Sequence, residues 1–302
     1  MCRRTGASSV AARRAAHWGV RMPVAHSEEY FDLTLASGRV KCRRIGAEDA
    51  PMTLLVHGLS AHMHGFDRVA ERLASPSRQL IAMDLRGRGD SEITPEGSYG
   101  LAAHCRDVLE IASKLGAERF DMVGWSMGAL TGILAANRTP ERLRRLVLID
   151  HAGAMDPGPV DKILKGFARL DMVVENRADY VAAIRAAGAI SAWTPFWEHY
   201  FDYELGPFGK GFKPRTSHAA CLEDLDDTSR HDWPSLWPGV KALTLLLRCE
   251  NPIGGGFIVP ESVRDAIRRA IPLIRVVEDA SDHYTVMTSE PAARAMRAFL
   301  DG

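Results

Sequence analysis

Short runs of aliphatic residues alternate with helical patterns from about residue 30 to the end of the chain. MTLLVHG (52–58), RFDMVGW (119–125) and LRRLVLIDHAG (143–153) predict buried strands. Between two of them, LAAHCRDVLEIASKLG (101–116) places its apolar residues on one helical face and ends at a glycine. Strands separated by helices predict an α/β fold with a mostly parallel sheet covered on both faces, because parallel strands need crossover connections.

The alternation stops at Gly153 and resumes with VKALTLLLRC (240–249). The intervening residues are helical in pattern and rich in aromatic side chains, which cluster within 180–212. An insertion of this length is a subdomain rather than a loop. We therefore expect a helical cap over 153–238, inserted into a core formed by 27–152 and 239–302.

The composition excludes several classes of partner. Lys plus Arg equals Asp plus Glu, 38 against 38, so no overall charge excess favours nucleic acid or an anionic membrane. No apolar run has the length of a membrane span. The five cysteines are scattered and never spaced as C-x-x-C, which predicts a reducing, cytoplasmic setting. A small-molecule substrate is the expected partner, and the sequence leaves the oligomeric state open.

Residues 1–26 differ in composition from the rest of the chain. They carry five arginines and no acidic residue, together with Ala, Ser and Gly. This composition is also found in transit peptides, but the apolar core of a secretory signal is missing. We expect a disordered tail or an over-long gene start, with Met22 as the alternative first residue.

The stretch DMVGWSMGAL (121–130) contains the motif G-x-S-x-G around Ser126. A shuffled chain of this composition would contain that motif about 0.13 times, so its context decides its value. Here a predicted strand precedes the motif and a predicted helix of small residues follows it. Glycine at positions 124 and 128 would permit a tight turn that presents the serine hydroxyl at the start of the helix. Ser126 is therefore the candidate nucleophile.

Two further segments follow predicted strands. MTLLVHG is followed by Leu59, whose backbone N–H can point to the same place as that of Met127. Two such donors form an oxyanion hole, which stabilises the negative oxygen of an acyl-transfer intermediate. The second segment, MDLRGRGDSE (83–92), is a turn punctuated by glycine.

Together these residues resemble the α/β-hydrolase superfamily, over about residues 30–300. The shared motifs are H-G at 57–58, D-x-R-G-x-G-x-S at 84–91, G-W-S-M-G at 124–128, and His283 in SDHY. The resemblance implies an eight-stranded sheet, a cap after the sixth strand, and His283 as the base that accepts the serine proton. The family often has glycine before this histidine; here the residue is Asp282, which we interpret as a variation of the loop.

The acid of the triad departs from the family pattern. The usual position, after the strand that follows the cap, offers only Glu250 and a glycine-rich stretch. The other position used in the family is the end of the preceding strand, where LVLID supplies Asp150. We favour Asp150 because it ends a well-defined strand, and keep Glu250 as the alternative.

The remaining expectations concern metals, cofactors and the residues that line the substrate site. H-M-H at 62–64 has no carboxylate or cysteine at ligand spacing, so we expect no metal there. No nucleotide or flavin motif is present either, and we expect no cofactor. The residues expected to line the substrate site are His57, Gly58, Trp125, Trp193 and Trp197.

The resemblance predicts a serine hydrolase acting on a carboxylic ester, lactone or thioester of a medium-sized apolar or aromatic compound, through an acyl-enzyme. Hydrolysis of a carbon–carbon bond beside a ketone, or acyl transfer, would use the same triad. A non-catalytic binding module on the same fold is a third hypothesis, which the presence of both Ser126 and His283 disfavours.

Overall fold

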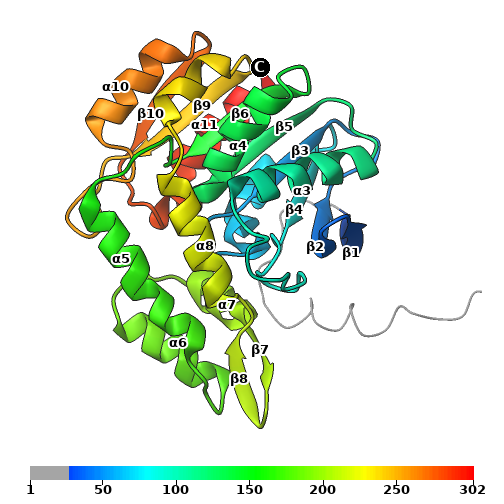
Figure 1. Cartoon of the computed structure of the whole chain (residues 1–302). Coiled ribbons are helices and arrows are strands. Elements are labelled where there is room, and N and C mark those ends of the chain that lie inside the picture. The colour runs from blue at the N-terminus through cyan, green and yellow to red at the C-terminus, as the bar shows by residue number, and fades with distance from the viewer. Residues whose placement is uncertain (1–26) are drawn as a thin grey trace, which may run out of the picture.

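A sheet of eight strands forms the centre of the computed structural model, which describes residues 27–302 (Figure 1). Its strands lie in the order β1-β2-β4-β3-β5-β6-β9-β10. Their bounds are β1 (Glu28–Leu35), β2 (Gly38–Ile45), β3 (Met52–Val56), β4 (Gln79–Met83), β5 (Phe120–Trp125), β6 (Leu143–Ile149), β9 (Leu243–Cys249) and β10 (Ile274–Asp279). The basic stretch 1–26 lies outside the described residues.

The sheet is mostly parallel, as predicted. β2 pairs antiparallel with both β1 and β4, and every pairing from β4 through β10 is parallel. The carboxyl ends of the parallel strands therefore meet along one edge of the sheet, where ligands bind in open α/β sheets. Ser126 and Asp150 directly follow two of these strands, β5 and β6.

Helices cover both faces of the sheet because the parallel strands are buried on both sides. In β3, Leu54 and Val56 belong to one apolar cluster and Leu55 to the other. The first face packs against α3 (Leu101–Lys114), α4 (Met127–Arg138) and α10 (Glu261–Ala270), and the second against α2 (Asp67–Leu73) and α11 (Glu290–Asp301). No helix within residues 27–302 has the length and apolar character that crossing a membrane requires.

Residues 153–238, which lie within the chain between β6 and β9, are here called the inserted segment. Its helices are α5 (Pro157–Phe167), η3 (Ala168–Asp171), α6 (Arg177–Ala186), α7 (Pro195–Glu204), α8 (His218–Ser229), α9 (Trp233–Leu236) and η4 (Trp237–Gly239). Helices α5 to α8 group at one end of the molecule, beyond the sheet (Figure 1). The last two, α9 and η4, return to the core and pack on α4 and α10.

The inserted segment also contains a hairpin, which the expectation of a helical segment did not include. The strands β7 (Leu205–Phe208) and β8 (Gly211–Pro214) pair antiparallel around a two-residue turn. Pro207 lacks the amide hydrogen that a continuing helix needs. Gly209 has a φ of +57° in the turn, a backbone conformation that favours glycine and suits a tight hairpin.

Candidate active site

Ser126 lies on a strained turn between β5 and α4. Its φ is +56°, which is uncommon for a residue with a side chain. The flanking glycines are required by close contacts: a Cβ at Gly124 would lie 2.2 Å from the carbonyl oxygen of Gly128, and one at Gly128 would lie 1.9 Å from that of Val56. The turn thus holds the hydroxyl at the amino end of a helix, as the motif predicts.

His283 connects the serine to a carboxylate. Its Nε2 is 3.0 Å from Ser126 Oγ, and its Nδ1 is 2.9 Å from Asp150 Oδ2. An ionised carboxylate can only accept, so Nδ1 carries the proton and Nε2 is free to accept from the serine hydroxyl. The serine, histidine and aspartate side chains are all buried, which strengthens the electrostatic coupling among them.

Asp150, rather than Glu250, reaches the histidine. The second oxygen of Asp150, Oδ1, accepts from the backbone N–H of Cys249 at 2.9 Å. Its backbone N–H donates to Leu247 at 2.8 Å and its φ is +45°, so the carboxylate is fixed against the end of β9. Glu250 is exposed to solvent. The partner of His283 is therefore the carboxylate at the end of β6, and not one at the end of β9, where the family usually has it.

The loop that carries His283 is held from two sides. Trp125 is buried, and its Nε1 donates to the backbone oxygen of His283 at 3.0 Å. Asp282 Oδ1 accepts from the backbone N–H groups of Tyr284 and Thr285, both at 2.9 Å, which closes the turn around the histidine. Trp125 was predicted to contact substrate, and the structure instead gives its indole a bond that positions the histidine.

His57 organises the loop that follows β3. Its Nε2 accepts from the backbone N–H of Leu85 at 2.9 Å, so its Nδ1 is the donor to the carbonyl oxygen of Gly58 at 2.8 Å. Burial lowers the pKa of His57 to about 3, so the ring is neutral. Both ring nitrogens are engaged with backbone, which corrects the prediction that His57 binds substrate. Gly58 itself lies against Ser126: a Cβ at Gly58 would be 3.0 Å from Ser126 Cβ.

The next two carbonyl groups of this loop are also held. Leu59 O accepts from Arg88 Nε at 3.0 Å and from Cys221 Sγ at 3.4 Å. Ser60 O accepts from Arg169 Nη2 at 2.9 Å. The carbonyl groups of residues 58, 59 and 60, here called the anchored carbonyls, are thus each fixed by a side chain.

Two buried ion pairs support these anchors from the inserted segment. Arg88 Nη2 is 2.5 Å from Asp224 of α8, and both side chains are fully buried. Arg169 Nη2 is 2.9 Å from Glu204 of α7, whose carboxylate is also fully buried. No pattern in the sequence points to Asp224 or Glu204, because each lies far along the chain from the loop it supports.

The predicted tryptophan contacts are only partly met. Trp197 is 1% exposed and packs edge-on against Phe196 and Tyr200, so it belongs to the apolar interior of the inserted segment. Trp193 is partly exposed and stacks on Phe201 with ring centroids 5.7 Å apart. Of the two, only Trp193 presents surface to solvent.

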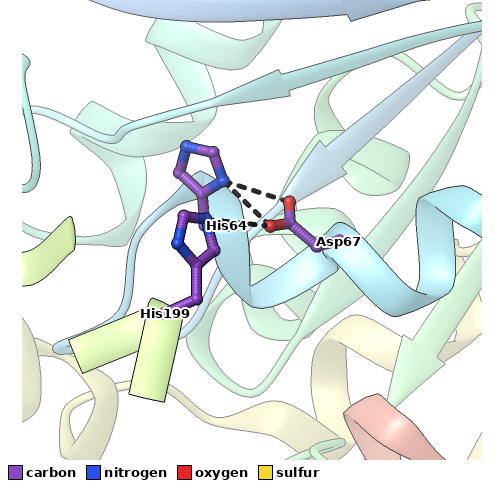
Figure 2. A group of neighbouring side chains, drawn as sticks. All are labelled: His64, Asp67 and His199. Atoms are coloured by element: carbon purple, nitrogen blue, oxygen red, sulfur yellow. Dashed lines mark hydrogen bonds and ion pairs between the residues drawn. The ribbon is translucent and has the colours of Figure 1, made fainter. Parts of the chain in front are cut away.

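A histidine and carboxylate cluster lies apart from this triad. His64, Asp67 and His199 converge so that one ligand atom from each lies within 4.8 Å of the other two (Figure 2). The absence of a nearby carboxylate was the reason for expecting no metal at residues 62–64. That reason was wrong, because Asp67 follows His64 by three residues and its carboxylate lies 3.0 Å from His64 Nδ1.

The fold and the site geometry agree with the family comparison. Residues 54–289 match the family model described as alpha/beta hydrolase fold. The chain therefore belongs to the α/β-hydrolase fold family.

Several characterised hydrolases are similar in part of their length. The chain is 35% identical to 2-hydroxymuconate semialdehyde hydrolase of Pseudomonas putida over 105 residues, which are 34% of this chain and 37% of that enzyme. It is 37% identical to N-formylmaleamate deformylase of the same species over 32% of this chain and 36% of the relative. An esterase of Mycobacterium tuberculosis is 29% identical over 46% of this chain and 44% of its own. Each match spans less than half of the relative.

Solved structures resemble nearly the whole chain. E-2-(acetamidomethylene)succinate hydrolase is 23% identical with a TM-score of 0.79, covering 91% of this chain and 100% of that structure. A thioesterase domain from the curacin biosynthetic pathway is 17% identical with a TM-score of 0.73, at the same coverage. At these identities the similarity shows the fold alone.

Proposed function

We propose that this hydrolase is a serine esterase that cleaves a carboxylic ester, lactone or thioester of a medium-sized apolar or aromatic compound through an acyl-enzyme. One observation carries the proposal: the continuous hydrogen-bonded chain from Ser126 Oγ through His283 to Asp150, at 3.0 and 2.9 Å. Such a chain activates a hydroxyl that is a weak nucleophile at neutral pH.

The proposed reaction has two halves. Ser126 Oγ attacks the ester carbonyl carbon while its proton passes to His283 Nε2. The bond to the leaving alcohol or thiol then breaks, and His283 returns the proton to it, which leaves an acyl-enzyme. Water attacks the acyl-enzyme with the same help, releases the acid and restores the serine. Asp150 stabilises the imidazolium formed in each half.

The oxyanion of each tetrahedral intermediate would be held by the N–H groups of Leu59 and Met127. Met127 is the first residue of α4, and the amide groups of a helix's first turn have no partner within the helix. In a planar trans peptide the N–H points away from the carbonyl group of the preceding residue. Because His57 fixes the Gly58 carbonyl in the interior, the Leu59 N–H is directed the opposite way.

Cysteine is a poor alternative nucleophile. Burial raises the pKa of Cys105 to about 11 and that of Cys42 to about 12. Burial likewise raises the pKa of Cys249, the thiol that lies next to Asp150. These groups stay protonated at neutral pH, and the thiolate is the reactive form.

A second candidate activity is hydrolysis of a carbon–carbon bond beside a ketone. It is favoured by the similarity to the hydrolase named for 2-hydroxymuconate semialdehyde, and the same three residues would serve it. The inserted segment, which we propose acts as a cap, would decide between the two substrates through the shape of the site.

A fluorophosphonate probe tests the proposal. The wild type should be labelled in one place, Ser126→Ala should not be labelled, and the exposed control Ser235→Ala should be labelled like the wild type. Equal labelling of Ser126→Ala would refute the assignment of the nucleophile. A panel of p-nitrophenyl esters, lactones and β-diketones then distinguishes ester cleavage from carbon–carbon cleavage, and inactivity on every ester and lactone would refute the esterase assignment.

A further inference from the structure

We propose that His64, Asp67 and His199 form a binding site for a divalent transition-metal ion, with Zn²⁺ as the reference ion. The inference does not depend on the proposed esterase activity. Two imidazoles and a carboxylate are ligands that zinc and its neighbours in the first transition row accept. Figure 2 shows both rings directed at the same carboxylate, with His64 and Asp67 contributed by the chain after β3 and His199 by α7.

The distances from the two histidines to the carboxylate are close to those of a zinc site. His64 Nδ1 is 3.0 Å and His199 Nε2 is 3.8 Å from Asp67 Oδ2. With Zn–N and Zn–O bonds near 2.1 Å, neighbouring ligand atoms of a tetrahedral site lie about 3.3–3.5 Å apart. The two observed separations bracket this value, so small side-chain rotations would accommodate an ion.

The carboxylate is already oriented for the task. Asp67 Oδ1 accepts from Arg43 Nη1 and also lies 3.1 Å from His64 Nδ1, while Oδ2 faces both histidines. Hydrogen bonding of a ligating carboxylate by an outer group is a regular feature of metal sites. The charge of Arg43 is offset in turn by Glu28, whose Oε1 is 2.8 Å from Arg43 Nε. These two carboxylates and one guanidinium give a net charge of −1, which favours a cation.

The site is packed against protein on the side of His64 and open to solvent on the side of His199. His64 is 6% exposed and packs against the rings of Tyr30 and Tyr203, with centroids 6.0 and 4.2 Å away. The His199 side chain is 36% exposed, so an ion can enter from solvent and keep water as its fourth ligand. Binding would join α7 of the inserted segment to the core.

The competing explanation is an ion pair that forms when a histidine is protonated, with no metal involved. The chain offers a matched control for it: His218 pairs with Asp171 at 2.5 Å on the surface, where Lys213 rather than a second histidine is the other partner. If both histidines only form ion pairs, replacing either one should have the same effect on Zn²⁺ binding. If His199 is a metal ligand, only its replacement should weaken Zn²⁺ binding.

The test is calorimetric titration of the full-length, metal-stripped protein with Zn²⁺, together with Co²⁺ absorption spectra and thermal unfolding with and without Zn²⁺. The wild type and His218→Gln should bind one ion tightly, show the visible bands of tetrahedral Co²⁺, and melt at a higher temperature with Zn²⁺. His64→Gln and His199→Gln should bind at least about tenfold more weakly.

His199 is on the surface, so His199→Gln should fold even if His64→Gln does not. Circular dichroism of each variant checks this. The proposal is overturned by an absence of stoichiometric binding in the wild type. It is equally overturned by a folded His199→Gln that binds Zn²⁺ as the wild type does, since the ion would then lie elsewhere.

Discussion

Replacing Asp150 by Asn should reduce turnover by about three to four orders of magnitude while leaving the fold intact. The carboxylate lies 2.9 Å from His283 Nδ1, which places the two charge centres about 4 Å apart when the imidazole is protonated. At an effective dielectric constant of about 20, that attraction is about 4 kcal/mol, or roughly 10³ in rate at about 1.4 kcal/mol per tenfold.

The tautomer of His283 adds to this loss. An asparagine can keep its oxygen on the Cys249 N–H and turn its NH₂ toward His283 Nδ1. Nδ1 then accepts, the ring proton moves to Nε2, and the base that Ser126 needs is lost. Loss of the orienting carboxylate in a serine protease lowers kcat about 10⁴-fold for this reason. We therefore expect kcat to fall about 10³- to 10⁴-fold, with KM changed little because no substrate contact is removed.

Steady-state hydrolysis of a p-nitrophenyl ester measures the effect, and circular dichroism confirms folding. Glu250→Gln is the matched control, because this carboxylate is exposed and should leave kcat near the wild-type value. An Asp150→Asn enzyme with near-normal kcat, or a large loss in Glu250→Gln, would refute the assignment of the acid.

Three further results are expected. Gly128→Ala should destabilise the fold by about 1–3 kcal/mol or more in urea unfolding, because its Cβ would lie 1.9 Å from a β3 carbonyl oxygen; Gly166→Ala, with nothing within 4 Å, should not. Asp224→Asn should lower the free energy of unfolding by about 3–5 kcal/mol, because Arg88 then lacks a charged partner in the interior. The exposed control Asp226→Asn should unfold at the same urea concentration as the wild type. Burial lowers the pKa of His151 to about 4, so it should be neutral when folded and protonate on unfolding below about pH 6.5. Its contribution to stability is complete above that pH and falls by about 1.4 kcal/mol per unit toward pH 4; His151→Gln should flatten the slope, and an unchanged slope would contradict the assignment.

Local patterns in the sequence were sufficient to predict the fold and the strained turn that carries Ser126. The strand, the two glycines and the helix around Ser126 are contiguous in the sequence, so this turn can be predicted without knowing any long-range contact. The sequence left the acid open between two residues, because the choice depends on which strand end faces His283. The burial of Trp197 could not be predicted either, because the number of aromatic residues in the segment does not show which of them pack into its interior.

Contacts that join distant parts of the chain could not be predicted. Asp224 meets Arg88, and His199 meets Asp67, across more than 100 residues in each case. The hairpin β7–β8 was missed for a different reason: its strands are only four residues long, too short for a period-2 pattern to emerge from an aromatic-rich helical background.

The anchored carbonyls limit how this enzyme can be recombined with its relatives. Leu59 O accepts from the thiol of Cys221 in α8, and Ser60 O accepts from Arg169 in η3, so the backbone of this loop is partly held by the inserted segment. A chimera that exchanges the whole of residues 153–238 would replace the segment that we propose acts as a cap, and it would lose both donors at once. Transplants that retain Arg169, Cys221 and Asp224 should therefore keep turnover, whereas those chosen by substrate contacts alone should fold and remain slow.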